Sequence, residues 1–139
     1  MLLAGCSGSG PGSTKDEIIA ADKAFSAMSA KVGPRAAFLE YFGSNAKMLN
    51  EVRQGKDGIN ALFTDLPANA TLTWEPAYVD ASESGELGYT WGRYTLTMPT
   101  VGRGKDPYIQ MGTYVTIWRH GSIGGWKVVL DGGHADGTK

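Results

Sequence analysis

The chain has 139 residues, the size of a single ordinary domain. Hydrophobic residues make up 42% and charged residues 19%, close to globular averages, which argues against intrinsic disorder and against a membrane bundle. The 13 basic and 14 acidic residues give a formal net charge of -1 with no long run of either sign. Because nucleic-acid binding needs a basic patch, we expect no nucleic-acid partner.

Residues 1–13 are predicted to precede the folded domain. The run Leu3-Ala4-Gly5-Cys6 places small residues before the only cysteine, and it resembles the lipobox of bacterial lipoproteins. That resemblance implies lipidation at Cys6, a location at the bacterial cell envelope, and membrane contact only through this lipid anchor. A secretion signal needs about 7 to 15 apolar residues, so we expect the natural start upstream; the alternative is a chance match in an ordinary N-terminus. The Gly- and Ser-rich residues 7–13 predict a flexible tether.

Two helices are predicted to open the domain, which we place at residues 14–139. Thr14 and Glu17 have the spacing of a capping box, so the first helix should start there. Apolar residues recur at helical spacing up to Val32, and Gly33-Pro34 then ends this helix and begins a second, shorter one. Residues 43–45 (Gly-Ser-Asn) predict its end.

A short strand and a third helix complete the first half. Residues 46–52 could form the strand, and residues 55–58 lead into the helix, whose apolar positions lie between Ile59 and Leu66. Pro67 and the polar residues after it end the helical half of the chain.

The second half is rich in β-branched and aromatic residues, in runs separated by turn residues, which predicts a meandering antiparallel sheet. The predicted strands are residues 71–81, 87–98, 109–119 and 126–130. Helices followed by strands favour an α+β layer fold over a parallel α/β sheet.

Five short stretches in this order resemble the nuclear-transport-factor-2-like (NTF2-like) superfamily, also called SnoaL-like or cystatin-like, and within it the DUF4440 branch. They are residues 21–25 (ADKAF), 36–39 (AAFL), 74–76 (WEP), 87–92 (LGYTWG) and 126–131 (WKVVLD). The resemblance covers about residues 15–134. It implies a cone in which three N-terminal helices close the concave face of a strongly curved, mainly antiparallel sheet, leaving an apolar pocket open at one end. Members of the superfamily include isomerases, dehydratases, cyclases and non-enzymatic domains, so function must be argued from the site.

Asp131 is the candidate general acid or base. It follows the apolar residues 128–130 at the end of the last predicted strand, and SnoaL-type enzymes of the superfamily place such an aspartate on a late strand. In an apolar cavity, desolvation would raise the pKa of its carboxyl group toward the working pH. The alternative is a turn residue before Gly132 and Gly133. Asp22, beside the apolar stripe of the first helix, could point into the cavity; the alternative is that it pairs with a base or caps a neighbouring loop. His134 could relay a proton to Asp131 or belong to a solvated tail.

Four aromatic residues are predicted to line the pocket, with an ordinary core position as the alternative for each. They are Trp74, Tyr94, Tyr114 and Trp118. The strand at 109–119 carries apolar groups on both faces, so one face should meet the helices and the other could pack against a second copy of the chain. Since dimers of this superfamily pair through their sheets, the resemblance implies a homodimer.

Motifs for cofactors and metals are missing from the sequence. It has no Gly-x-Ser-x-Gly nucleophile elbow and no nucleotide-binding loop, and the two histidines and one cysteine lie too far apart to suggest metal ligands. We therefore expect no cofactor and no metal. Three hypotheses remain. The first is an envelope-anchored, non-catalytic domain that binds a small apolar ligand or a protein partner, and the second is a cofactor-independent lyase or isomerase that uses Asp131. A purely structural or dimerisation role is the third possibility.

Overall fold

The computed structural model describes residues 11–49, 53–64, 66–99, 106–121 and 125–137. The helices and strands, in chain order, are α1 (Pro11–Val32), α2 (Pro34–Tyr41), β1 (Phe42–Met48), β2 (Arg53–Gln54), α3 (Gly55–Leu62), β3 (Thr71–Ala81), β4 (Leu87–Met98), β5 (Tyr108–His120) and β6 (Trp126–Ala135). Cys6 and the lipobox-like run lie outside the described residues, so lipidation stays a prediction. None of the helices in the described part of the chain has the length and hydrophobicity needed to span a membrane.

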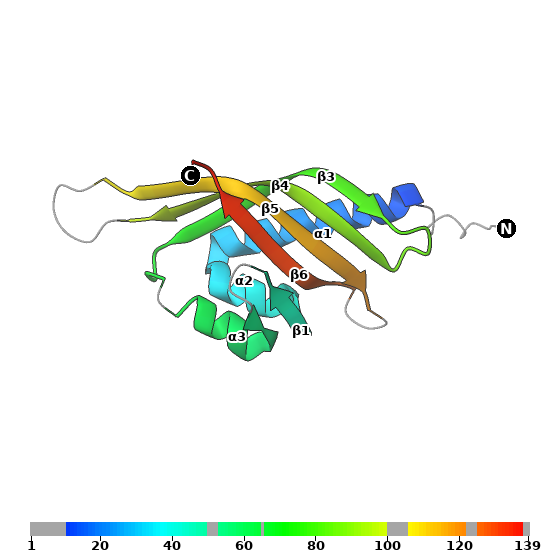
Figure 1. Ribbon diagram of the computed structural model, residues 1–139, viewed down its shortest axis with the longest axis horizontal. Coiled ribbons are helices and arrows are strands. Elements are labelled where there is room, and N and C mark those ends of the chain that lie inside the picture. The colour runs from blue at the N-terminus through cyan, green and yellow to red at the C-terminus, as the bar shows by residue number, and fades with distance from the viewer. Residues whose placement is uncertain (1–10, 50–52, 65, 100–105, 122–124, 138–139) are drawn as a thin grey trace.

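The strands form one mixed sheet in the order β2-β1-β6-β5-β4-β3. Neighbouring strands are antiparallel except β1 and β6, which run parallel. Figure 1 shows α1 lying along one face of the curved sheet, with α2 and α3 gathered beside β1. The predicted α+β class, with three N-terminal helices on a mainly antiparallel sheet, is confirmed.

Several elements, α1, α3 and β1 among them, have bounds that differ from the sequence prediction. The first helix begins at Pro11, a residue that suits a first helical turn, so Thr14 lies inside the helix instead of capping it. The third helix, Gly55–Leu62, begins and ends earlier than the apolar spacing of residues 59–66 predicted. The first strand, Phe42–Met48, likewise begins before residue 46.

The difference that matters for function is the length of β6, which continues to Ala135 instead of ending at residue 130. Gly132 and Gly133 pair with Val115 and Tyr114 of β5, so they are strand residues and not a turn. Asp131 therefore lies inside a strand, and the interpretation of this residue as a strand terminator is wrong. His134 is likewise a strand residue, opposite Thr113, and not part of a frayed tail.

The core is an aromatic cluster between α1, α2 and the sheet. The ring of Phe25 lies 4.9 Å from that of Phe38, 4.8 Å from Tyr41 and 4.6 Å from Trp74, between centroids. Aromatic pairs of this kind contribute about 0.5–1.5 kcal/mol each beyond their buried area. This cluster packs α1 and α2 against the concave face of the sheet. The opposite end of that face is left open for a pocket.

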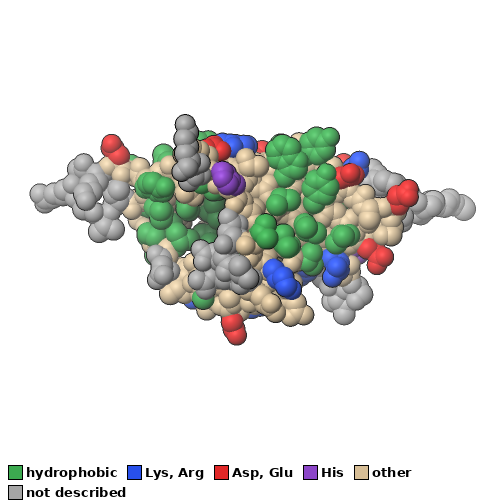
Figure 2. Space-filling view, in the orientation of Figure 1, with side chains coloured by type: hydrophobic (Ala, Val, Ile, Leu, Met, Phe, Trp, Pro, Cys, Tyr) green, Lys and Arg blue, Asp and Glu red, His purple; other side chains and the backbone are tan. Residues whose placement is uncertain are grey.

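The outer face of the sheet also carries apolar side chains. Tyr78 and Trp91 are 58% and 41% exposed and stack with their ring centroids 6.0 Å apart. Beside them is a shallow groove of about 300 Å³, whose apolar lining includes Tyr89, Val115 and Ile117. Figure 2 shows this group of hydrophobic side chains to the right of the centre, over the strands. The sheet therefore has apolar groups on both faces, and the helices cover only one.

Candidate functional site

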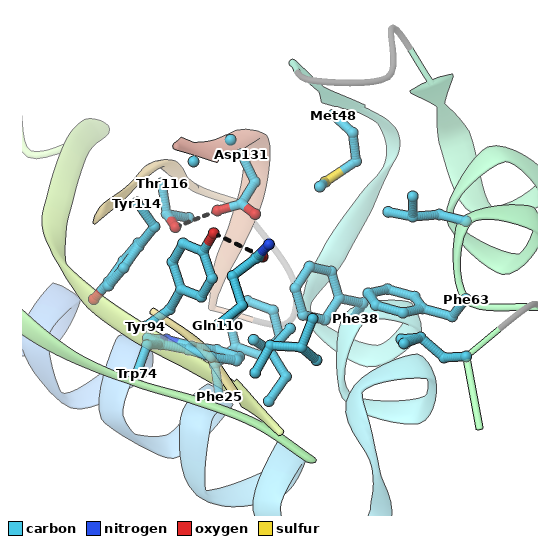
Figure 3. A pocket seen from close by; sticks show the side chains of 16 residues that line it. Phe25, Phe38, Met48, Phe63, Trp74, Tyr94, Gln110, Tyr114, Thr116 and Asp131 are labelled. Atoms are coloured by element: carbon cyan, nitrogen blue, oxygen red, sulfur yellow. Dashed lines mark hydrogen bonds between the residues drawn. The ribbon is translucent and has the colours of Figure 1, made fainter. Parts of the chain in front are cut away.

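A pocket of about 360 Å³ lies between the sheet and the helices. In Figure 2 it opens as a hollow edged by hydrophobic side chains, to the left of the centre. Its apolar wall consists of Phe25, Phe38, Met48, Leu62, Phe63, Leu66, Leu72 and Leu96. The side chains that carry polar atoms are Trp74, Tyr94, Gln110, Tyr114, Thr116 and Asp131. Figure 3 shows the polar ends of Tyr94, Gln110 and Asp131 on one side of the pocket, with Phe38 and Phe63 on another.

Among the described residues of the lining, Asp131 is the only one with a carboxyl group, and none is a lysine, arginine or histidine. It is 9% exposed, and the hydroxyl of Thr116, opposite it on β5, donates a hydrogen bond of 2.5 Å to Oδ1. Burial raises the pKa of the Asp131 carboxyl group to about 7; the Thr116 hydrogen bond opposes this rise and the negative Asp22 adds to it. Near neutral pH, Asp131 can therefore either accept or donate a proton.

The second carboxyl oxygen of Asp131, Oδ2, has no hydrogen-bond donor among the residues that the structure describes. A buried polar atom without a partner is costly unless water or a ligand satisfies it. The Asp131 side chain lines the pocket, so a bound molecule could supply that partner.

Glycines on β5 and β6 leave the space that the ring of Tyr94 occupies. A Cβ at Gly112 would lie 2.5 Å from Cε1 of Tyr94, and a Cβ at Gly133 would lie 3.3 Å from the same atom. The ring therefore packs directly over backbone that has no side chain. In this position the Tyr94 hydroxyl reaches Gln110, with 3.3 Å between its oxygen and Oε1. The two side chains form a second polar group on the pocket wall, one that can both donate and accept hydrogen bonds.

Asp22 lies behind the pocket wall and is fully buried. It accepts hydrogen bonds from Nε1 of Trp74 at 2.8 Å and from the hydroxyl of Tyr114 at 2.6 Å. Burial raises the pKa of Asp22, and the hydrogen bonds from Tyr114 and Trp74 oppose that rise. Burial and the negative charge of Asp22 in turn raise the pKa of Tyr114. Asp22 thus holds two aromatic lining residues in place from α1.

The predicted site residues fall into two groups in the structure. Asp131, Trp74, Tyr94 and Tyr114 line the pocket, whereas Asp22 and Trp118 do not. Trp118 is 0% exposed because α1 and α2 cover its part of β5, where its ring lies 6.1 Å from that of Phe25 and 6.2 Å from that of Tyr41. Trp118 is therefore a core residue, which was the alternative interpretation.

The sequence reasoning did not single out Thr116 or Gln110, although both lie on the inner face of β5. The two-residue alternation with Tyr114 was the available signal, since residues 110, 114 and 116 share one face of a strand. The two histidines are exposed: His134 lies opposite Thr113 and His120 stacks edge-on against Trp126, 5.0 Å away. No group of three or more potential metal ligands occurs in the described ranges.

Solved structures of other proteins share this architecture. No protein-family model matches the sequence, and no curated protein matches it. An NTF2-like superfamily protein from Salmonella enterica serovar Typhimurium superposes with a TM-score of 0.70 at 13% identity, covering 92% of this chain and 94% of that one. This chain has the NTF2-like fold. The resemblance that its short sequence stretches indicated is confirmed at the level of the fold, while membership of the DUF4440 branch stays a prediction.

Two other structures with the NTF2-like fold show how varied their descriptions are. A ketosteroid isomerase-like protein from Erwinia carotovora atroseptica has a TM-score of 0.68 at 12% identity, covering 88% of this chain and 99% of that one. The association domain of CaMKII from C. elegans has a TM-score of 0.65 at 9% identity, covering 88% of this chain and 96% of that one. Enzyme-like and association domains therefore share this architecture, and the fold leaves the function open.

Proposed function

We propose that the cone binds a small, mainly apolar molecule that carries one polar end, and that this polar end contacts Asp131. The observation that carries the proposal is a pocket of about 360 Å³ with an apolar wall, in which Asp131 is the one carboxyl group among the described lining residues. Small-molecule sites in proteins are commonly hollows of roughly 300–1,000 Å³ with a few polar groups that orient the ligand. Oδ2 of Asp131, which has no donor among the described side chains, supplies such a group.

The binding energy in this proposal comes from the apolar wall, and the orientation comes from the polar side. Each Å² of apolar ligand surface removed from water contributes about 25 cal/mol. Phe38 and Phe63 stack edge-on with their centroids 4.8 Å apart, and Asp22 anchors Trp74 and Tyr114 from behind. The wall is therefore largely formed before a ligand enters, and little ordering has to accompany binding.

The test is a titration with N-phenyl-1-naphthylamine, an apolar dye whose fluorescence rises in apolar sites. Leu96→Gln places a polar group in the pocket wall, and we expect it to weaken binding by roughly tenfold, the effect of about 1.4 kcal/mol. Leu87→Gln is the matched control, because Leu87 lies on the same strand but in the outer groove. If Leu87→Gln weakens binding and Leu96→Gln does not, the dye occupies the outer groove and the proposal fails.

The second candidate function is a cofactor-independent lyase or isomerase. It is favoured by Asp131, whose carboxyl pKa of about 7 suits a group that takes a proton from a ligand carbon and returns it elsewhere. The non-catalytic function is favoured because the only protein side chain that hydrogen-bonds to Asp131, among the described residues, is the hydroxyl of Thr116. A threonine hydroxyl orients a carboxyl group but does not titrate near neutrality.

We also propose that the outer sheet face pairs with a second copy of the chain and that the domain is held at the cell envelope by a lipid on Cys6. The exposed Tyr78 and Trp91 support the first part, because large exposed apolar side chains grouped on one face commonly mark interaction surfaces. The lipobox-like run at residues 3–6 supports the second part.

A further inference from the structure

We propose that the polar end of the ligand is an amine, so that the pocket takes an apolar amine and excludes carboxylic acids of the same shape. This inference rests on the proposed ligand binding and names the class of molecule bound. It follows from three observations on the described residues: Oδ2 of Asp131 has no donor from them, no basic residue is among those that line the pocket, and the lining presents aromatic faces.

The carboxyl group is arranged to receive a donor. Thr116 donates to Oδ1 and thereby orients the group, while Oδ2 has no donor from the described chain. An ammonium group carries only donors, and a hydrogen bond between it and a carboxylate is roughly twice as strong as one between neutral groups. A ligand carboxylate carries only acceptors, so it would meet Asp131 with like charge and no partner.

The charges described around Asp131 support a preference for a positively charged ligand. The titratable groups that face it are Tyr94 from β4, Tyr114 from β5 and Asp22 from α1, behind the wall. The lining residues contributed by α2, α3, β1 and β3 include no charged side chain. The lysine nearest in register on β1, Lys47, is exposed and donates to the carbonyl of Asn45. Among the side chains that the structure describes in the pocket lining, none would place a second positive charge beside a buried cation of the ligand.

The rest of the lining is suited to a cation with an apolar body. Six aromatic rings line the pocket: Phe25, Phe38, Phe63, Trp74, Tyr94 and Tyr114. The face of an aromatic ring attracts an organic cation, most strongly where water is excluded. Desolvation of the ammonium is costly unless it is paired and hydrogen-bonded, and the carboxylate of Asp131 meets that need.

The experiment measures the affinities of three probes that share one body: 2-naphthylmethylamine, 2-naphthylmethanol and 2-naphthoate. A second set, octylamine, octanol and octanoate, covers a flexible body. Isothermal titration calorimetry at pH 8 should show the amine binding roughly tenfold to a hundredfold more tightly than the alcohol, the range expected of a charge-assisted hydrogen bond, and the acid binding most weakly. Between pH 5.5 and pH 8 amine binding should tighten by about thirtyfold as Asp131 ionises, while alcohol binding stays constant.

Asp131→Asn keeps the shape of the side chain and removes its charge. In this variant the amine should lose its advantage and its pH dependence, while the alcohol binds as it does to the wild type, which shows that the pocket is intact. Asp80→Asn removes a carboxylate that is exposed and lies outside this pocket, and it should leave the preference for the amine unchanged.

Each outcome decides between the two proposals. If the alcohols bind and the amines bind no more tightly, the amine inference fails and the proposed ligand binding stands. If acid and amine bind equally, or if an Asp131→Asn variant retains the amine preference, the inference also fails. If no probe of either set binds at millimolar concentration, the proposed ligand binding fails together with it.

Discussion

Replacement of Asp131 by Asn should make the stability of the protein less dependent on pH. The carboxyl pKa is about 7 in the folded protein, against 3.8 for an unperturbed aspartate. Between these two values the folded state holds a proton that the unfolded state has lost, so the free energy of unfolding falls as pH rises through this window. Above pH 7 the decrease is complete, and below pH 3.8 it is absent.

The magnitude follows from the difference between the two pKa values. One pKa unit corresponds to about 1.4 kcal/mol, so ionisation of the buried Asp131 lowers the free energy of unfolding by roughly 4 kcal/mol at pH 8 and by roughly 1.5 kcal/mol at pH 5. Asn does not ionise, so the variant shows neither of these decreases in the free energy of unfolding. Its amide NH2, placed where Oδ2 was, has no acceptor and costs about 1–3 kcal/mol at every pH. The stability of the variant relative to the wild type should therefore rise by roughly 2.5 kcal/mol between pH 5 and pH 8.

Urea unfolding at pH 5, 6, 7 and 8 measures this difference for both proteins. The constant cost of the Asn amide cancels in the comparison, so the change with pH is the quantity to test. Asp80→Asn is the matched control: Asp80 is exposed, and its pKa is lowered first by the backbone N–H of Ala81 and then by Lys15. It should show no gain in stability on raising the pH. A stability difference between Asp131→Asn and wild type that stays constant from pH 5 to pH 8 would refute the reasoning.

Three further substitutions test the remaining parts of the structure. Tyr114→Phe removes a hydrogen-bond donor from the buried Asp22 and should lower the free energy of unfolding, measured in urea, by about 1–3 kcal/mol. Tyr108→Phe, at an exposed position, should lower it by less than about 0.5 kcal/mol. Trp91→Glu puts a charge on the exposed apolar face, so light scattering at micromolar concentration should show the wild type at twice the monomer mass and the variant as a monomer; a monomeric wild type would rule out the dimer. Cys6→Ser, expressed with the natural upstream region, should move the protein from the membrane fraction to the soluble fraction, and soluble, exported wild-type protein would contradict lipidation.

The sequence by itself determined the fold class and most of the strands. Predicted strands 71–81 and 87–98 coincide with β3 and β4, because runs of β-branched and aromatic residues bounded by turn residues encode strands locally. The helical spacing of Ile18, Phe25 and their neighbours marked the face of α1 that the core buries. These are local signals, which depend on residues a few positions apart.

Only the tertiary structure decided the site. Gly132 and Gly133 look like a turn in the sequence, but they pair with β5, and β6 continues to Ala135. Asp131 therefore lies within the strand and in the pocket wall, and not at a strand end. Whether an inward-facing aromatic residue lines the pocket or lies in the core depends on which helix covers it, and α1 and α2 cover Trp118 but leave Tyr94 open. Burial and partners of a side chain are set by elements distant in the chain, so the raised pKa of Asp131 and the role of Asp22 behind the wall could not be derived from local pattern.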